Sequence, residues 1–121
     1  MKTRLALFVP FLAVALAACA PPSKYEWGNY ERDFIAYYGD PSTADAFAAK
    51  LSATIAQGEA KGNVPPGLNA EYGYLMLQAG NAEAAIQAFE KEKAAWPEST
   101  TFMDLMIGHA RGGKSENQAS K

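Results

Sequence analysis

The chain has very few of the residues from which metal sites, disulfides and catalytic centres are built. Its 121 residues include one cysteine and one histidine. A disulfide needs two cysteines and a structural zinc site needs several Cys or His ligands, so the chain cannot form either alone. No serine lies in a glycine-flanked elbow, and no glycine-rich phosphate loop occurs. The sequence therefore gives no support for an enzyme, and we expect no catalytic residues, no metal and no cofactor.

Positive charge is also scarce. Lys2 and Arg4 precede an apolar segment, and without them the chain keeps nine basic and thirteen acidic residues, a net charge of about −4. Nucleic acids and anionic lipid surfaces attract proteins through an excess of Lys and Arg. The charge balance therefore argues against nucleic-acid binding and against electrostatic binding to a membrane.

The one long apolar run lies at the N-terminus, over residues 5–18. It is too short for a membrane-spanning helix, and it follows two basic residues, so we interpret residues 1–18 as a signal peptide. The run ends in the sequence LAAC, which resembles the lipobox of bacterial lipoproteins, with Cys19 as the residue that takes the lipid. The alternative is an ordinary cleaved signal followed by an unmodified cysteine.

Lipidation of Cys19 would place the protein in the cell envelope. Several acyl chains on one cysteine anchor a protein firmly. In the enterobacterial sorting rule an aspartate after the cysteine retains a lipoprotein in the inner membrane, and this chain has Ala20 instead. By this resemblance we expect an outer-membrane protein that is lipid-anchored and faces the periplasm, with residues 19–28 as a short tether.

Apolar side chains recur at helical spacing on both sides of Gly80-Asn81. They are Tyr72, Leu75, Met76 and Ala79 before this pair, and Ala82, Ala85, Ile86 and Phe89 after it. Gly80-Asn81 permits a turn and Pro97 ends the second helix. Two amphipathic helices joined by so short a turn must lie antiparallel, so residues 68–97 are predicted to form a helical hairpin.

The same reasoning predicts helices on either side, and an all-α domain over residues 29–111. A short aromatic helix ends at Gly39-Asp40-Pro41. A second helix runs from about Ser42 to Gly58, and Gly58 and Gly62 are expected to end it. The buried face of this second helix is predicted to comprise Ala44, Phe47, Ala48, Leu51 and Ile55. A last helix follows Ser99, and the polar residues 112–121 are expected to be a disordered tail.

The central hairpin resembles a tetratricopeptide repeat. Gly73 and Ala85 stand at the small positions where the helices cross, Phe89 at the large apolar position, and Pro97 at the end. Asn69, Met76 and Glu92 depart from the repeat pattern. Trp27, Tyr30 and Phe34 suggest a degenerate first repeat. The resemblance implies one clear and one degenerate repeat plus a C-terminal helix, and the alternative is a helical hairpin unrelated to this family.

The last helix is apolar on nearly all sides, whereas the closing helix of a repeat array normally has a polar outer face. We therefore predict a partner surface formed by Phe102, Met103, Met106 and Ile107. The alternative is that these side chains pack within the monomer.

The aromatic N-terminal segment allows two further interpretations. Tyr25 and Trp27 could rest at the membrane interface or pack on the domain. Glu31 and Asp33, beside these aromatics, could act as a glycan-binding or hydrolytic pair, although two acids on one helix are usually an exposed surface.

The lipobox, the segment Tyr25-x-Trp27-Gly28-x-Tyr30-Glu31 and the hairpin with its final apolar helix together resemble a family of uncharacterised Gram-negative lipoproteins with a domain of unknown function. Members are often encoded beside a lipoprotein resembling the curli secretion pore. The resemblance implies a helical adaptor that binds another envelope protein, such as this pore-like lipoprotein, in an outer-membrane lipoprotein assembly. A peptidoglycan- or glycan-directed accessory factor and a self-associating structural lipoprotein are the alternatives.

Overall fold

The computed structural model describes residues 22–119, with side chains as far as residue 112. In this range it contains α-helices and short 3-10 turns but no strand, which confirms the all-α prediction. The elements are α1 (Tyr30–Gly39), η1 (Pro41–Thr43), α2 (Ala44–Lys61), α3 (Leu68–Gln78), α4 (Ala82–Ala95), η2 (Pro97–Ser99) and α5 (Thr100–Ala119). The predicted signal peptide (1–18) and the predicted lipidation site, Cys19, lie outside the described residues.

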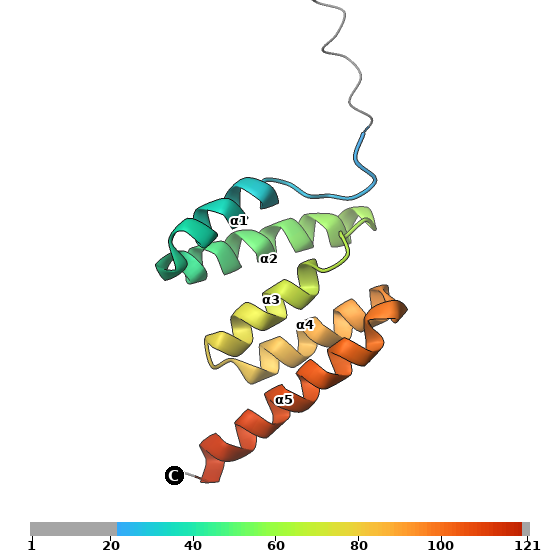
Figure 1. The fold of residues 1–121 in the computed structure, drawn as a ribbon. Helices are drawn as coiled ribbons and strands as arrows, with labels where there is room; N and C mark the ends of the chain where they lie inside the picture. Colours follow the sequence, from blue (N-terminus) through green and yellow to red (C-terminus); the bar gives the residue numbers. More distant parts are fainter. Residues whose placement is uncertain (1–21, 120–121) are drawn as a thin grey trace, which may run out of the picture.

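The helices pack in chain order, each against the one before it. Figure 1 shows each helix running back beside its predecessor, so that α1 and α5 lie at opposite ends of the stack. Two contacts skip one helix. Tyr30 Oη donates a hydrogen bond to Glu71 Oε2 at 2.6 Å, which links α1 to α3. Lys91 Nζ lies 2.7 Å from Glu59 Oε1, which links α4 to α2. These contacts bring α1 close to α3 and α2 close to α4 across the helix between them.

The turn at the centre of the stack follows the sequence prediction. Gly80 has a φ of +78°, a conformation that glycine adopts without steric cost. The Asn81 side chain accepts a hydrogen bond from the Ala84 backbone N–H at 3.1 Å and so caps the first turn of α4. The turn therefore ends one helix and starts the next within three residues, 79–81, which makes α3 and α4 antiparallel neighbours.

The end of α2 differs from the prediction. The helix continues past Gly58 to Lys61 and is capped by Gly62, whose φ is +68°. Gly58 is buried inside the helix, where a Cβ atom would lie 2.9 Å from the Cα of Val64. The absence of a side chain at Gly58 therefore allows the following loop to pack against α2. The left-handed residue that caps the helix is Gly62.

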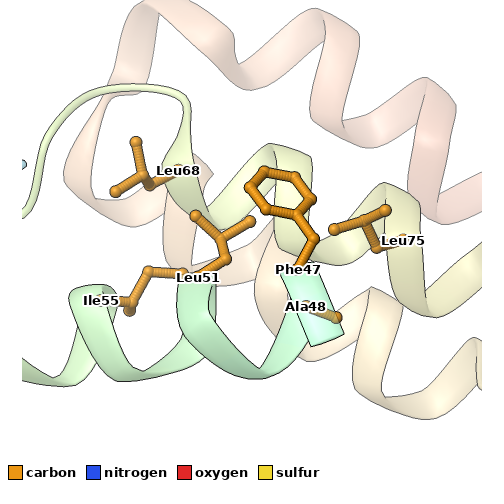
Figure 2. Close-up of a cluster of buried hydrophobic side chains, with 6 residues drawn as sticks. All are labelled: Phe47, Ala48, Leu51, Ile55, Leu68 and Leu75. Carbon is orange, nitrogen blue, oxygen red and sulfur yellow. The ribbon is translucent and has the colours of Figure 1, made fainter. Parts of the chain in front are cut away.

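The first part of the core lies between α2 and α3 (Figure 2). Its buried side chains are Phe47, Ala48, Leu51 and Ile55 from α2 and Leu68 and Leu75 from α3. The α2 residues are those that the sequence predicts, apart from Ala44, which is half-buried. Spacing alone was sufficient here because α2 has one apolar face and one polar face.

The second part of the core joins α4 to α5. Ala85 and Phe89 of α4 pack against Met103 and Ile107 of α5. Met103 and Ile107 retain 1% and 3% of their accessible surface, so they belong to the core and not to the predicted partner surface. They are buried because the side of α5 that carries them faces α4.

Gly73 sets the distance between α3 and α4. A Cβ atom at this position would lie 2.6 Å from Cε1 of Phe89 and 3.1 Å from the backbone oxygen of Ala85. The Phe89 ring is itself buried and belongs to the second cluster. The three residues that the sequence analysis assigned to helix packing therefore meet at one point. Pro97 has its assigned role as well, since α4 ends at Ala95 and Pro97 begins η2.

Glu92 is an unexpected part of the core, since only 3% of its surface is exposed. Its Oε1 atom accepts a hydrogen bond from the Gly67 backbone N–H at 2.7 Å. Gly67 is the N-cap of α3 and has no side chain to cap the helix. A carboxylate from α4 thus satisfies the first turn of α3, where backbone N–H groups lack helical partners.

The last helix is longer than expected. α5 extends to Ala119, so it includes most of the segment 112–121 for which the sequence analysis expected a disordered tail. No proline follows Pro97. The chain therefore has no residue after α5 begins that would force the helix to stop.

We expect Gly73→Ala to lower the free energy of unfolding by about 1–3 kcal/mol, because the added methyl group overpacks the contact with Phe89. Gly108→Ala is the matched control, since it adds the same methyl group to an exposed helical glycine with no atom within 4 Å. The control should raise the free energy of unfolding by about 0.5–1 kcal/mol through helix propensity. Urea unfolding measures both changes, and a stabilised Gly73→Ala protein would contradict the close packing.

We also expect Glu92→Gln to change how stability depends on pH. Burial raises the pKa of Glu92, although the N–H groups of Gly67, Ala70 and Asn69 oppose the rise. The folded protein therefore binds this proton more tightly than the unfolded chain. This contribution to stability is lost as the pH rises from the ordinary glutamate pKa through the raised one. The unfolding free energy of Glu92→Gln, measured relative to wild type, should increase over that pH range. A difference that stays constant across pH would contradict the raised pKa.

Candidate functional site

Large exposed apolar side chains come from alternate helices of the stack. Among the described residues they are Trp27, Phe34, Ile35, Tyr38, Tyr74, Phe102 and Leu105. All of them belong to α1, α3 or α5, or to the turn just before α1. Since α2 and α4 contribute none of them, α1, α3 and α5 carry the candidate interaction surfaces.

The outer side of α5 carries the most exposed aliphatic residue of this set. Leu105 retains 68% of its accessible surface and Phe102 58%, whereas Met106 is half-buried. The two exposed side chains are three residues apart, which places them on the same side of the helix. Of the predicted partner surface, therefore, Phe102 remains exposed, Met106 is intermediate, and Met103 and Ile107 are buried. Leu105 was not assigned to that surface, although its spacing from Phe102 would have identified it.

An ion pair fixes how α5 presents this face. Lys93 Nζ of α4 lies 2.7 Å from Asp104 Oδ1 of α5, and 3.4 Å from Glu90 Oε2 on its own helix. The Lys93 pKa is raised, chiefly by the hydrogen bond to Asp104. Together with buried Met103 and Ile107, this contact sets the rotation of α5, which leaves Phe102 and Leu105 outside.

The aromatic residues of the N-terminal segment form a continuous row of rings. Trp27 lies 5.6 Å from Tyr30, Tyr30 lies 5.9 Å from Phe34, and Phe34 lies 6.3 Å from Tyr38, as measured between ring centroids. We call these four residues the aromatic ladder. Its inner edge rests on Phe47 of α2, at 6.3 Å from Tyr30 and 6.2 Å from Phe34.

Tyr30 holds the ladder in place. Its hydroxyl donates to the Glu71 carboxylate, and burial raises the pKa of both groups. The glutamate also adds to the rise at Tyr30, because a phenolate would lie beside a second negative charge. The ladder is therefore attached to α3 as well as to α2.

The chain before α1 is docked on the domain. The Tyr25 and Trp96 rings meet edge to face with centroids 5.7 Å apart. The Glu26 backbone N–H donates to the Asn63 backbone oxygen at 3.0 Å, and the Glu26 carboxylate forms an ion pair with Lys61. Tyr25 thus packs on the domain, as one of the two interpretations held, whereas Trp27 keeps 38% of its surface exposed.

The two acids beside the aromatics do not form a catalytic pair. Asp33 is buried against α2, where Lys50 Nζ lies 3.0 Å from its Oδ1 atom. Glu31 is exposed. Residues two apart on a helix point to different sides, so the two carboxylates face different surroundings. Asp33 therefore serves as a contact between α1 and α2.

The structure has two hollows that bear on a small ligand. A hollow of about 500 Å³ lies along residues 27–32, at the start of α1, and is lined by that one segment alone. A groove of about 200 Å³ lies between α2, α3 and α4, beside Asn69, Tyr72 and the Glu59–Lys91 ion pair, and its volume is below the roughly 300–1,000 Å³ typical of small-molecule sites. In the described part of the chain, no three His, Cys, Asp or Glu side chains come together as a metal site would need. Nor does any helix there have the length and apolar character to cross a bilayer.

A comparison with family models places this surface in a defined domain. The model described as a domain of unknown function, DUF4810, matches residues 24–106, a range that includes the aromatic ladder and both Phe102 and Leu105. No curated protein and no solved structure shows significant similarity to the chain. The match confirms the expectation of an uncharacterised family. The chain belongs to the DUF4810 family.

Proposed function

We propose that the protein is a lipid-anchored helical adaptor that binds another envelope protein through the outer face of α5. In this proposal Cys19 carries the lipid, the protein sits on the periplasmic face of the outer membrane, and the partner is a lipoprotein similar to the curli secretion pore. The observation that carries the proposal is the exposure of Phe102 and Leu105 at the open end of the helical stack.

The cost of exposing these two side chains supports a binding role. Burying a Leu or Phe side chain contributes about 1.5–3 kcal/mol, and this contribution is missing at both positions. A helical array normally ends in a helix with a polar outer face. Apolar residues at the centre of a small patch, with polar neighbours such as Asp104 and His109, are typical of a protein interface.

The proposal includes a tetratricopeptide-like arrangement of the helices. Its support is the contact of Gly73 with Phe89 and Ala85 in the central hairpin, where the family also brings its helices close. Such arrays usually need at least about three repeats to be stable. With only two hairpins and one further helix, the stack leaves its terminal faces uncovered, and a partner on α5 would complete it.

We expect Cys19→Ser to abolish lipidation and membrane anchoring. A serine hydroxyl does not replace the thiol nucleophile that takes the diacylglycerol. Fractionation of cells, followed by the intact mass of the purified protein, measures both effects. Wild type should carry acyl mass and sediment with the outer membrane. Acylated, membrane-bound Cys19→Ser protein would contradict the assignment of this residue.

We expect Phe102→Glu combined with Leu105→Glu to abolish partner binding and leave the fold intact, because both side chains point away from the core. Two buried carboxylates would cost several kcal/mol at an interface. Crosslinking in cells and affinity purification should recover the pore-like lipoprotein with wild type and not with the variant.

Two controls separate binding from folding in this experiment. Arg111→Glu changes the charge at an exposed position of the same helix that lies on a different side from Phe102 and Leu105, and it should retain the partner. Ile107→Glu places the charge in the core and should unfold α5, with a loss of helical circular dichroism. Retention of the partner by the double variant would exclude the α5 face. Recovery of the chain itself in place of a partner would favour a self-associating lipoprotein.

A further inference from the structure

A second apolar surface lies at the other end of the stack, on α1. It consists of the aromatic ladder (Trp27, Tyr30, Phe34 and Tyr38) together with Ile35. Tyr38 retains 79% and Ile35 62% of its accessible surface, and Trp27 and Phe34 each expose more than a third. Figure 1 shows α1 and α5 separated by the rest of the stack, so this surface is distinct from the Phe102–Leu105 face.

We infer that this α1 surface rests on the phospholipid bilayer that holds the anchor. The inference depends on the proposed lipidation of Cys19. Its ligand is the headgroup and upper acyl region of a membrane, where the amphipathic rings of Trp and Tyr are favoured and Phe and Ile gain from burial. The four exposed side chains, Trp27, Phe34, Ile35 and Tyr38, supply apolar area for this contact without any need for positive charge.

The length of the chain before the domain argues for a membrane over other occupants. The chain is docked on the domain from Tyr25, through its contacts with Trp96 and Asn63. Cys19 is six residues earlier. A fully extended chain spans at most about 3.3–3.6 Å per residue, which limits the distance from the lipid-bearing residue to Tyr25 to roughly 20 Å. The anchor thus holds Trp27, two residues further on, close to the bilayer.

The turn at Trp27 is rigid, so its exposure is not the result of a loose end. The Tyr30 backbone N–H donates to the Trp27 oxygen at 3.0 Å. Gly28 between them has a φ of +51°, and a Cβ atom there would lie 3.2 Å from the Thr54 hydroxyl of α2. The backbone is therefore pressed against α2, and the indole is held at the edge of the ladder.

The charges near the ladder do not oppose contact with a membrane. The carboxylates of Glu26 and Asp33 are paired with Lys61 and Lys50. Arg32 is largely exposed and can reach lipid phosphates, which offsets the exposed Glu31. Because attraction comes from apolar burial, binding of this surface should change little with salt or with the fraction of anionic lipid.

This orientation also serves the proposed adaptor. With α1 on the bilayer, the outer face of α5 lies at the end of the stack away from the lipid. The protein would then present Phe102 and Leu105 to a partner in the periplasm, where the bilayer does not cover them.

Tryptophan fluorescence can test the contact directly, because the chain has only two tryptophans, Trp27 and Trp96. Acylated full-length protein is reconstituted into vesicles of phosphatidylethanolamine and phosphatidylglycerol whose acyl chains are brominated or not, since bromine quenches nearby indoles. Trp96→Phe leaves Trp27 as the single reporter. A matched reporter at the other end is Phe102→Trp in a chain with both Trp27→Phe and Trp96→Phe.

The bromolipids should quench Trp27 several-fold more than the Phe102→Trp reporter. Adding Ile35→Glu and Tyr38→Glu to the Trp96→Phe protein should reduce the quenching of Trp27 several-fold, with circular dichroism unchanged because both side chains are exposed. Anchored protein with unquenched Trp27 would overturn the inference, as would equal quenching of the two reporters.

The intact mass of the same preparation shows whether Cys19 carries the lipid. An unmodified Cys19 would overturn the lipoprotein proposal and this inference together, whereas acylated protein with unquenched Trp27 would overturn this inference alone.

Discussion

The contact between Gly73 and Phe89 is the constraint on which the rest of the structure depends. The ring of Phe89 occupies the space that a side chain at position 73 would need, so the approach of α3 to α4 seen here requires glycine at this position. The same ring packs against Met103 and Ile107, which determines the side of α5 that is buried. A single small residue on α3 therefore controls the placement of α5, and with it the exposure of Phe102 and Leu105.

The two ends of the stack follow from how few helices it contains. Each helix buries one side against its neighbours, and α1 and α5 each lack a neighbour on one side. Polar contacts fix both terminal helices in place: Tyr30 with Glu71 and Asp33 with Lys50 at one end, and Lys93 with Asp104 at the other. The apolar side chains left outside therefore lie on helices that already have contacts with the domain, which reduces the conformational entropy that binding would have to remove. In the proposals above, lipid covers the surface on α1 and a protein covers the one on α5.

The sequence predicted the features that depend on local pattern. Gly80-Asn81 marked the central turn, and Phe47, Leu51 and Ile55 marked the buried side of α2, because a helix with one apolar face has one way to pack. The rotation of α5 could not be predicted, since Phe102, Met103, Leu105 and Ile107 surround the helix and packing on α4 selects among them. The roles of Gly58 and Glu92 were missed for a similar reason. Gly58 is needed because Val64, in the loop after α2, packs against it. Glu92 is needed because the Gly67 N–H, which is 25 residues earlier in the chain, donates to its carboxylate.

In the proposed function, the outer face of α5 binds another envelope protein while lipid anchors the chain. The most direct measurement is photocrosslinking in cells from a photoreactive residue at position 105, compared with one at the exposed position 111, on a different side of the same helix. We expect an adduct with one envelope lipoprotein from position 105, and a much weaker one from position 111. An adduct containing only the chain itself, or none above background from either position, would contradict it.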